Sequence, residues 1–434
     1  MMRSTIGTLT LVLAVAMIFG GALGAAEDST AAAVTFHQDI EPLFQHNCQG
    51  CHRPEGTSLG GMIAPMSLTT YEEVRPWVKS IARKVADKSM PPWFASEHTK
   101  GLFANERTLT AEEIAMVVSW ASSGAPRGNP ADAPPTPVWA DNDGWFMGEP
   151  DLVIDLEEPF WIDDDLRDVN ISLKAERLTR ELLPEPRWIR AIEFRPGSTA
   201  VHHIIASKRA AAAERPGATG MIGGIAPGTE PFRLPEGTGR LLLPDTQIFF
   251  QMHYNKEPGE GTGLWDDSKM AIWFHDRDAK IERIATWDAI GNSGFEIPPS
   301  YERWAVGASK IFDYDTTIFG YLPHMHLRGA YAKYVAYYPD GSEEILLEVP
   351  EYDWNWQTNY EYKEPKVIPA GTRIEVSMEF TNTEERNALV DMDLNTKRAV
   401  RFGGPTSDEM MLGFMDFAEH KPIDMGAETP SSGG

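Results

Sequence analysis

The chain contains little cysteine and has no excess of basic residues. Its 434 residues include two cysteines, which share one motif, so we expect no structural disulfide. Lysine and arginine together number 39 against 64 aspartates and glutamates, which gives a formal net charge of −25. Such a surface repels phosphate groups, and the sequence has no basic tract. We therefore expect neither nucleic acid nor an anionic membrane as a partner.

Long apolar runs are also missing beyond the N-terminus. No later segment reaches the roughly 18 apolar residues that cross a bilayer, so we expect no stable membrane insertion. The N-terminus carries Arg3, an apolar stretch over residues 9–23 and small residues at 24–26, which is typical of a secretory signal. A transmembrane helix is the alternative, but glycines interrupt the stretch and two acidic residues follow it. We predict that residues 1–26 are removed and that the protein is exported, to the periplasm or outside the cell.

Both cysteines belong to a C-x-x-C-H motif formed by Cys48, Cys51 and His52. In an exported chain the two thiols of this motif add to the vinyl groups of a haem, and the histidine binds the iron. A thioredoxin-like redox pair or a disulfide are the alternatives. The redox pair normally lacks the histidine and lies in a βαβ setting that this sequence does not have. The motif therefore predicts one covalent haem c.

The residues around this motif predict a small all-α, cytochrome c-like domain over residues 33–125. An apolar face over residues 35–46 predicts a helix that leads into the motif. Capping-box patterns begin at Thr70 and Thr110, and each indicates the start of a further helix. Three short helices around a haem fit a domain of this size.

A methionine is the expected sixth ligand of the iron, and the candidates are Met62, Met66 and Met90. Met90 opens a Met-Pro-Pro-Trp segment whose prolines restrict the backbone, and this pattern is familiar in small cytochrome domains. A rigid turn with a core methionine is the other interpretation of the segment. We favour Met90 as the ligand.

Beyond the helical region the composition changes twice. Residues 126–150 are rich in proline and predict a semi-extended linker. From there onward, apolar and polar residues alternate between turn signals, which predicts antiparallel strands. We expect two all-β sandwiches of the jelly-roll type, at residues 151–290 and 291–424, divided near Pro298 and Pro299. A disordered tail is expected over the last ten residues, 425–434.

Five of the eleven histidines lie at three places in this β-rich region, each after an apolar, strand-like run: His202 and His203, His253, and His324 with His326. His324 and His326 are two residues apart, so a strand would present both on one face. Adjacent residues on a strand point to opposite faces, so His202 and His203 can bind one metal only if the strand bulges or ends there. A single histidine such as His253 is more often structural. The set as a whole indicates a metal site.

A methionine near the C-terminus extends this set. Met410 follows Asp408 and Glu409, and a thioether combined with imidazoles suits copper that cycles between Cu(I) and Cu(II). A core position remains the default for any single methionine among the 18 in the chain.

Residues 151–421 resemble the copper type II, ascorbate-dependent monooxygenases, such as peptidylglycine alpha-hydroxylating monooxygenase and dopamine beta-monooxygenase. The resemblance implies two jelly-roll domains that hold two copper ions, one of which activates O2 for hydroxylation of a C–H bond while the other supplies the second electron. It implies that His202, His203 and His253 bind the electron-supplying copper, and that His324, His326 and Met410 bind the copper that activates O2. The matching pieces, in order, are Val201-His202-His203-Ile204, Gln251-Met252-His253-Tyr254, Pro323-His324-Met325-His326-Leu327 and Asp408-Glu409-Met410.

The chain departs from the family at the positions that anchor a peptide substrate. The family's animal members are rich in disulfides, whereas this part of the chain has no cysteine. Where the peptide hydroxylase has an arginine, an asparagine and a tyrosine, this chain has Leu322, Leu412 and Phe414. These three residues are expected to face the cavity near the methionine-ligated copper, so the predicted substrate is a small, apolar or aromatic organic molecule. Arg328 is the remaining basic residue nearby that could hold a carboxylate.

The sequence thus predicts an exported monooxygenase that receives electrons from an external donor through the fused cytochrome and uses O2 to hydroxylate a small organic substrate. A non-enzymatic copper-binding or electron-transfer protein with a β-sandwich scaffold is the first alternative. The second is a sugar- or partner-binding module on a cytochrome, with the histidines in its core and no copper.

Overall fold

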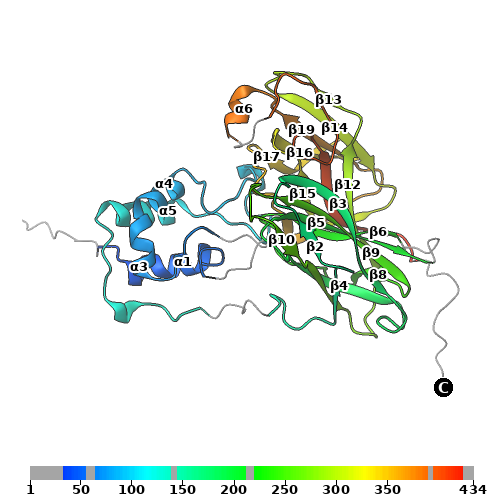
Figure 1. The fold of residues 1–434 in the computed structure, drawn as a ribbon, viewed down its shortest axis with the longest axis horizontal. Coiled ribbons are helices and arrows are strands. Elements are labelled where there is room, and N and C mark those ends of the chain that lie inside the picture. The colour runs from blue at the N-terminus through cyan, green and yellow to red at the C-terminus, as the bar shows by residue number, and fades with distance from the viewer. Residues whose placement is uncertain (1–32, 55–63, 138–143, 212–218, 390–393, 424–434) are drawn as a thin grey trace, which may run out of the picture. The chain divides into compact units, whose positions relative to one another are not determined.

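The computed structural model describes residues 33–54, 64–137, 144–211, 219–389 and 394–423. The predicted signal, Met62, part of the linker and the predicted tail lie outside the described residues. The chain divides into two compact units, Met1–Ala33 and Val34–Gly434, and the described helices and strands all belong to the second. This unit is mostly β-sheet (Figure 1). Among the described helices, none has the length and apolar character needed to cross a membrane.

Short helices around their own apolar core precede the strands. Both predicted capping boxes are confirmed, at Thr70 and Thr110. Phe36, Phe44 and Trp120 are buried in this core and contact one another edge to face or tilted. Burying each such side chain is worth roughly 1.5–3 kcal/mol. The helices are η1 (Phe36–Ile40), α1 (Glu41–Asn47), α3 (Tyr71–Val74), η2 (Arg75–Trp77), α4 (Val78–Ala86), η3 (Glu97–Thr99), α5 (Ala111–Ser122) and η4 (Pro130–Asp132).

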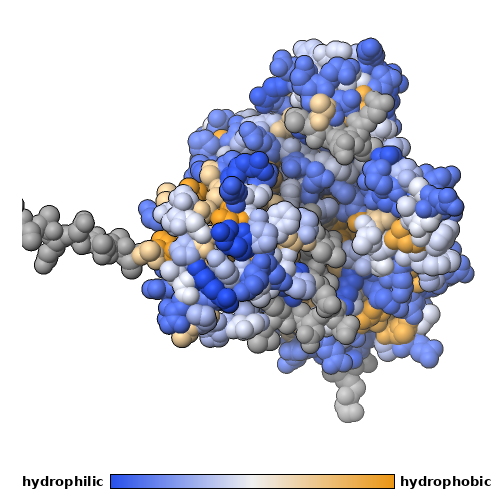
Figure 2. Space-filling model, turned by 60° about the vertical axis from the view of Figure 1, so that its left-hand side comes forward, coloured by the Kyte–Doolittle hydropathy of each residue, from blue (hydrophilic) through white to orange (hydrophobic). Residues whose placement is uncertain are grey.

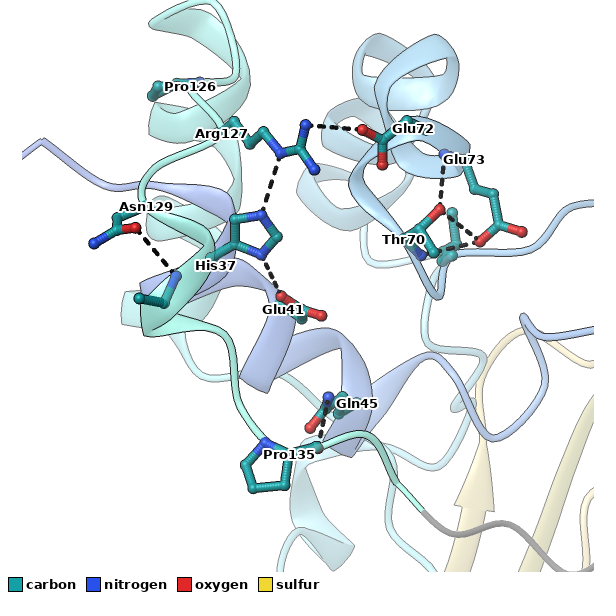
Figure 3. Close-up of polar contacts among 12 residues, drawn as sticks. His37, Glu41, Gln45, Thr70, Glu72, Glu73, Pro126, Arg127, Asn129 and Pro135 are labelled. Atoms are coloured by element: carbon teal, nitrogen blue, oxygen red, sulfur yellow. Dashed lines mark hydrogen bonds and ion pairs between the residues drawn. The ribbon is translucent and has the colours of Figure 1, made fainter.

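The first part of the predicted linker packs against these helices. Arg127 donates to His37 (Nε to Nε2, 3.3 Å), and Nδ1 of His37 lies 2.7 Å from a carboxylate oxygen of Glu41 (Figure 3). Arg127 also forms an ion pair with Glu72 at 2.9 Å. Further along, Gln45 donates to the carbonyl of Pro135. The described start of the segment is therefore held by the helical region and does not extend freely from residue 126.

A nine-stranded sheet runs through both halves of the β-rich region, in the order β1-β11-β4-β8-β12-β21-β15-β18, with β7 beside β4. A sheet of order β3-β9-β5-β6 covers its first half, and one of order β14-β19-β16-β17 covers its second. Two-stranded pairs, β10-β2 and β13-β20, complete the set.

The first seven strands are β1 (Leu152–Asp155), β2 (Phe160–Ile162), β3 (Asp168–Leu178), β4 (Arg187–Arg195), β5 (Val201–Ala210), β6 (Thr219–Ile225) and β7 (Phe232–Arg233). The next seven are β8 (Thr238–Leu242), β9 (Thr246–Asn255), β10 (Leu264–Asp266), β11 (Lys269–Phe274), β12 (Arg283–Asn292), β13 (Glu296–Ile297) and β14 (Trp304–Ile311). The last seven are β15 (Thr316–His324), β16 (Gly329–Tyr337), β17 (Glu343–Val349), β18 (Tyr360–Ile368), β19 (Arg373–Phe380), β20 (Val400–Arg401) and β21 (Met411–Glu419), with α6 (Glu384–Leu389) between β19 and β20.

Each half encloses its own apolar core between two facing sheets. In the first, Ile204 and Phe250 of one sheet meet Ile192 and Ile272 of the other. In the second, the aromatic and aliphatic residues of β16 and β19 meet those of β15 and β21. Buried and more exposed positions alternate along strands such as β19, which is the pattern that predicts these strands from the sequence.

The two halves join through strands β8 and β12, which pair in parallel: Arg283 lies opposite Thr238, and Ile284 lies opposite Gly239. The boundary expected between residues 290 and 291 falls inside β12. Beyond Arg283 and Ile284, β12 pairs with β21 of the second half from Ala285 to Asn292, so most of the strand belongs to that half. The boundary between the two β halves therefore lies before residue 290, in the connection between β11 and β12 over residues 275–282.

Residues 93–107 leave the helical region and pack on the second β half. Trp93 and Phe103 contribute to its core, and Phe103 is fully buried. Ser96 donates its N–H to the carbonyl of Glu348, and Ala104 donates to that of Glu361. The stretch predicted as one helical domain, 33–125, is therefore interrupted by a segment that belongs to a β core.

The face shown in Figure 2 is covered mainly by hydrophilic residues, with hydrophobic ones scattered among them. The large apolar side chains that are exposed include Trp77, Phe146 and Trp265.

Candidate metal centre

Two neighbouring strands of the first half position the first three histidines. His202 and His203 lie on β5, and His253 lies on β9 directly opposite His203. The register shifts between Val201 and His203, which is the bulge that two adjacent histidines need in order to serve one metal. One ring nitrogen from each of the three lies within 4.8 Å of the others, and Nδ1 of His203 and Nδ1 of His253 are 3.3 Å apart.

The other two histidines come from the end of β15 in the second half. His324 is the last residue of this strand and His326 follows in a turn, with 5.4 Å between their ring centroids. Met410 is buried and directly precedes β21, the strand that pairs with β15. The carboxylate of Glu409 accepts the backbone N–H groups of His326 (2.8 Å) and Arg328 (2.6 Å), so the segment before Met410 is tied to the His326 turn.

The structure brings all five histidines together in one buried cluster. The rings of His203 and His324 are 5.1 Å apart, and those of His253 and His326 are 6.2 Å apart. Trp354 stacks on His202 at 4.0 Å with an angle of 8° between the planes. Its ring also lies 5.6 Å from His253 and 5.4 Å from His326. The two sets predicted for separate domains therefore meet around one tryptophan.

Asp168, the first residue of β3, fixes the proton of His253. Its Oδ1 lies 2.6 Å from Nε2 of His253, and its Oδ2 accepts both the N–H (2.7 Å) and the hydroxyl (2.8 Å) of Thr406. Burial raises the pKa of Asp168, but the hydrogen bonds and the neighbouring His253 outweigh it and lower the pKa to about 2. An ionised carboxylate can only accept, so Nε2 of His253 carries the proton and Nδ1 presents its lone pair.

Neutral hydrogen-bond acceptors likewise fix the tautomers of His324 and His326. Nδ1 of His324 lies 2.5 Å from Oε1 of Gln357, and Nδ1 of His326 lies 3.2 Å from the carbonyl oxygen of Asp408. Both rings therefore carry the proton on Nδ1 and present the lone pair of Nε2.

The ring nitrogens that have no hydrogen-bond partner could bind a metal. Nε2 of His324, Nε2 of His326 and both ring nitrogens of His202, one of which carries the proton of the neutral ring, are buried and have no hydrogen-bond partner among the described residues. Leaving a buried polar group unsatisfied costs about 1–3 kcal/mol, which coordination to an ion would offset. Burial, the largest cause, lowers the pKa of His324 to about 4 and those of His202, His203 and His326 well below the usual range. These four rings are therefore neutral at pH 7, the form that binds metals.

A cavity of about 20 Å³ lies beside the cluster and is lined by one histidine of each set, His203 and His324. Leu322 and Phe414 line it as predicted, together with Trp287, whose ring stacks on Phe414 at 4.4 Å. Leu412 packs against the same apolar group without lining this cavity. The volume is about that of a single water molecule.

A wider cavity of about 430 Å³ adjoins the small one and shares Trp287 and Leu322 with it. The buried ion pair of Arg240 with Asp416 also lines this wider space. The described lining of the small cavity includes no lysine or arginine, whereas that of its neighbour includes Arg240.

Arg328 is not placed to hold a substrate. Its Nε donates to Oδ1 of Asn382 at 2.9 Å, and a terminal nitrogen donates to the carbonyl of Ser407 at 2.7 Å. The side chain is almost fully buried, so its role is to brace the loop that precedes Met410.

The C-x-x-C-H motif directly follows α1. Nδ1 of His52 lies 3.1 Å from the carbonyl oxygen of Met66, so Nε2 presents its lone pair, the arrangement that an iron ligand requires. Burial raises the pKa of the Cys48 thiol to about 12, which argues against a redox-active thiolate. Met90 lies after α4, is partly buried and donates its N–H to the carbonyl of Lys84 at 3.1 Å.

No family model and no curated protein matches the chain. Among solved structures, it is similar to an empty top-component particle of cowpea mosaic virus at 5% identity, with 61% of this chain and 92% of that one covered and a TM-score of 0.27. It is also similar to the VP2 subviral particle of infectious bursal disease virus at 10% identity, with 63% and 81% covered and a TM-score of 0.17. The tandem CBM22 domain of Paenibacillus barcinonensis Xyn10C is 8% identical, with 57% and 86% covered and a TM-score of 0.13. TM-scores this low do not indicate a shared fold.

Proposed function

We propose that this protein is an exported, copper-dependent monooxygenase with a fused cytochrome c-like domain and two sandwiches of the jelly-roll type. The reaction consumes RH, O2, two electrons and two protons and yields ROH and water. The observation that carries the proposal is the buried cluster of five histidines, in which partner groups fix the tautomers of His253, His324 and His326 so that one lone pair of each is available to a metal.

The donor set favours copper over other metals. Imidazole nitrogens with one thioether form a soft to borderline environment that suits both Cu(I) and Cu(II). His202, His203 and His253 would hold one ion, and His324, His326 and Met410 the other. Copper, when bound, supplies one-electron redox chemistry and the activation of O2.

The chain's own residues would orient and shield this centre. Asp168, Gln357 and the Asp408 carbonyl hold three imidazoles in the tautomer that binds metal. Leu322 and Phe414 make the small cavity apolar, which excludes water and favours a neutral C–H group beside His324. Substrate would enter through the wider cavity and reach the centre past these two residues.

Electrons would come from an external donor through the haem held by Cys48, Cys51 and His52. The carbonyl of Met66 bonds the Nδ1 side of His52, so Met66 lies on the side of the ring away from the iron-binding nitrogen. This argues against Met66 as the sixth ligand and favours Met90.

The small size of the inner cavity favours a second candidate, a copper-binding electron-transfer protein without oxygenase activity. Metal analysis and oxygen consumption separate the two. We expect about one iron and two coppers per purified chain, and O2 uptake when the haem is reduced in the presence of substrate. Two coppers without O2 uptake would favour the second candidate, and the absence of copper would contradict both.

Replacing Met90 with alanine should lower the haem reduction potential and remove the weak sulfur-to-iron band near the red end of the visible spectrum, because a thioether ligand raises the potential. Potentiometry and the oxidised absorption spectrum measure both effects. Met66→Ala is the matched control and should leave band and potential in place. Loss of the band in the control instead would show that Met66 is the ligand.

Neutral aromatic or apolar substrates should be hydroxylated in preference to glycine-extended peptides. A carboxylate beside Leu322 and Phe414 would lose its hydration without a charged partner, at a cost of several kcal/mol. Oxygen consumption with a reduced donor, compared between the two substrate types, measures the preference. Efficient turnover of a glycine-extended peptide would contradict this prediction.

A further inference from the structure

A further cavity, of about 770 Å³, is lined by strands β5, β6, β8 and β9 of the first half and by β12 of the second. Clefts that bind small organic ligands have volumes of roughly 300–1,000 Å³, so this cavity is large enough for one. It shares Trp287 with the small cavity beside the metal centre, but its described lining includes no histidine. The cavity is therefore separate from the histidine cluster.

Lys208 of β5 lines this cavity and is a buried basic residue that the proposed reaction does not use. Only 7% of the residue is exposed, and Nζ donates to the carbonyl oxygen of Leu241 on β8. A protonated amine has three N–H groups, so this single carbonyl satisfies one of them. The charged group that acts on the amine is the guanidinium of Arg240, and among the described residues no carboxylate pairs with it.

The charged residues of the lining carry a surplus of positive charge. They are four basic residues and one acidic residue: Lys208, Arg209, Arg240, Lys421 and Asp288. Asp416 forms an ion pair with Arg240, and a carboxylate oxygen of Glu419 lies 2.7 Å from Nζ of Lys421. Two cations therefore remain against one carboxylate, in a chain whose formal net charge is −25. One net positive charge matches a monoanion, which favours a carboxylate over a phosphate dianion.

Other parts of the lining are apolar and aromatic. Met221 of β6, Phe249 of β9 and Trp287 of β12 all border the cavity. Covering a hydrocarbon group with such side chains is favourable because it removes apolar surface from water. The lining thus combines one buried amine with an apolar wall.

We propose that this cavity binds a small organic carboxylate, whose anionic group pairs with the amine of Lys208 while its apolar or aromatic part packs against Phe249 and Trp287. The site lies apart from the histidine cluster, and it does not depend on the proposed function.

Binding of the carboxylate should be coupled to uptake of a proton. Burial, the largest cause, and the neighbouring Arg240 guanidinium lower the pKa of Lys208 to about 7. A bound carboxylate favours the charged amine and raises this pKa. At pH 8 the free amine is mostly neutral and gains a proton when the ligand binds, so the affinity should fall as the pH rises above 7.

Isothermal titration calorimetry of the full-length protein, loaded with haem and copper, tests the proposal with phenylacetate and its uncharged isostere phenylacetamide. We expect phenylacetate to bind about tenfold or more tightly than the amide at pH 7, because the amide cannot form a charge-assisted hydrogen bond with the amine. At pH 8, titrations in two buffers of different ionisation enthalpy should show proton uptake. These measurements need no variant.

Lys208→Met removes the amine and keeps most of the apolar stem. It should lower the affinity for phenylacetate about tenfold or more and abolish the proton uptake, while the copper content stays unchanged. Lys174→Met is the matched control, because Lys174 is an exposed lysine on β3 of the same sheet, and it should retain wild-type affinity. Absence of phenylacetate binding, equal affinities for acid and amide, or wild-type affinity in Lys208→Met would overturn the proposal. Each of these outcomes leaves the proposed function standing.

Discussion

Replacing Asp168 with asparagine should weaken copper binding at the first histidine set by about 10- to 100-fold, the range seen when a carboxylate behind a metal-binding histidine is lost. The asparagine amide would turn a donor towards either His253 or Thr406, both of which now donate to the carboxylate. The ring of His253 would lose its fixed tautomer. Competition with a copper chelator measures the affinity.

Asp165→Asn is the matched control because Asp165 is an exposed carboxylate three residues earlier in the same segment. It should leave the affinity unchanged. Equal affinities in wild type and Asp168→Asn would mean that His253 is not oriented through this carboxylate.

The ionisation of Asp168 also makes the stability of the folded protein depend on pH. The pKa of Asp168 is depressed from the usual 3.8 to about 2 in the folded protein. Its stabilising contribution is therefore fully present above the unfolded value and is lost as the pH falls through 2. We expect wild type and Asp168→Asn to differ in free energy of unfolding at pH 6 and to converge as the pH falls towards 2, as measured by denaturant titration.

Local patterns in the sequence are enough to predict several features of this fold. The capping boxes at Thr70 and Thr110 depend on residues three apart, so their spacing is visible directly in the sequence. Strand alternation shows that His202 and His203 need a bulge, and the register shift at Val201 supplies it. These features depend on neighbours in the chain.

The groups that complete the site come from long-range pairing and leave no local signal. Asp168 meets His253 across 85 residues, and Gln357 meets His324 across 33. Trp354 follows no motif, because its position against His202 depends on how the loop before β18 lies between the two halves. Such contacts follow from the packing of strands, which spacing along the sequence does not encode.

Domain boundaries also depend on long-range packing that the local sequence does not reveal, as residues 93–107 show. The Met-Pro-Pro-Trp pattern predicts part of a helical domain, whereas Trp93 and Phe103 pack beside Tyr360 in the second β core. An apolar residue gives no indication of which core it joins when two cores lie within reach of one segment.

Replacing Met410 with alanine should reduce oxygen consumption by about a hundredfold or more, because metal assistance to the transition state is worth several kcal/mol. The remaining imidazoles of His324 and His326 would hold the second copper weakly, so copper content should fall from two towards one per chain. Metal analysis and an oxygen electrode measure the two effects. Met411 and Met415 pack in the apolar core of the second β half, to which Met410 does not belong, and this argues against either as the ligand.

Met415→Leu is the matched control, since a change of one core side chain for another of similar volume usually costs less than about 1.5 kcal/mol in stability. It should retain two coppers and nearly full oxygen consumption. Full activity with two coppers in Met410→Ala would show that Met410 is not a ligand. Loss of both coppers in Met410→Ala would mean that the first set binds its ion only when the second is occupied, the behaviour of a centre in which Asp168 and Trp354 hold both sets together.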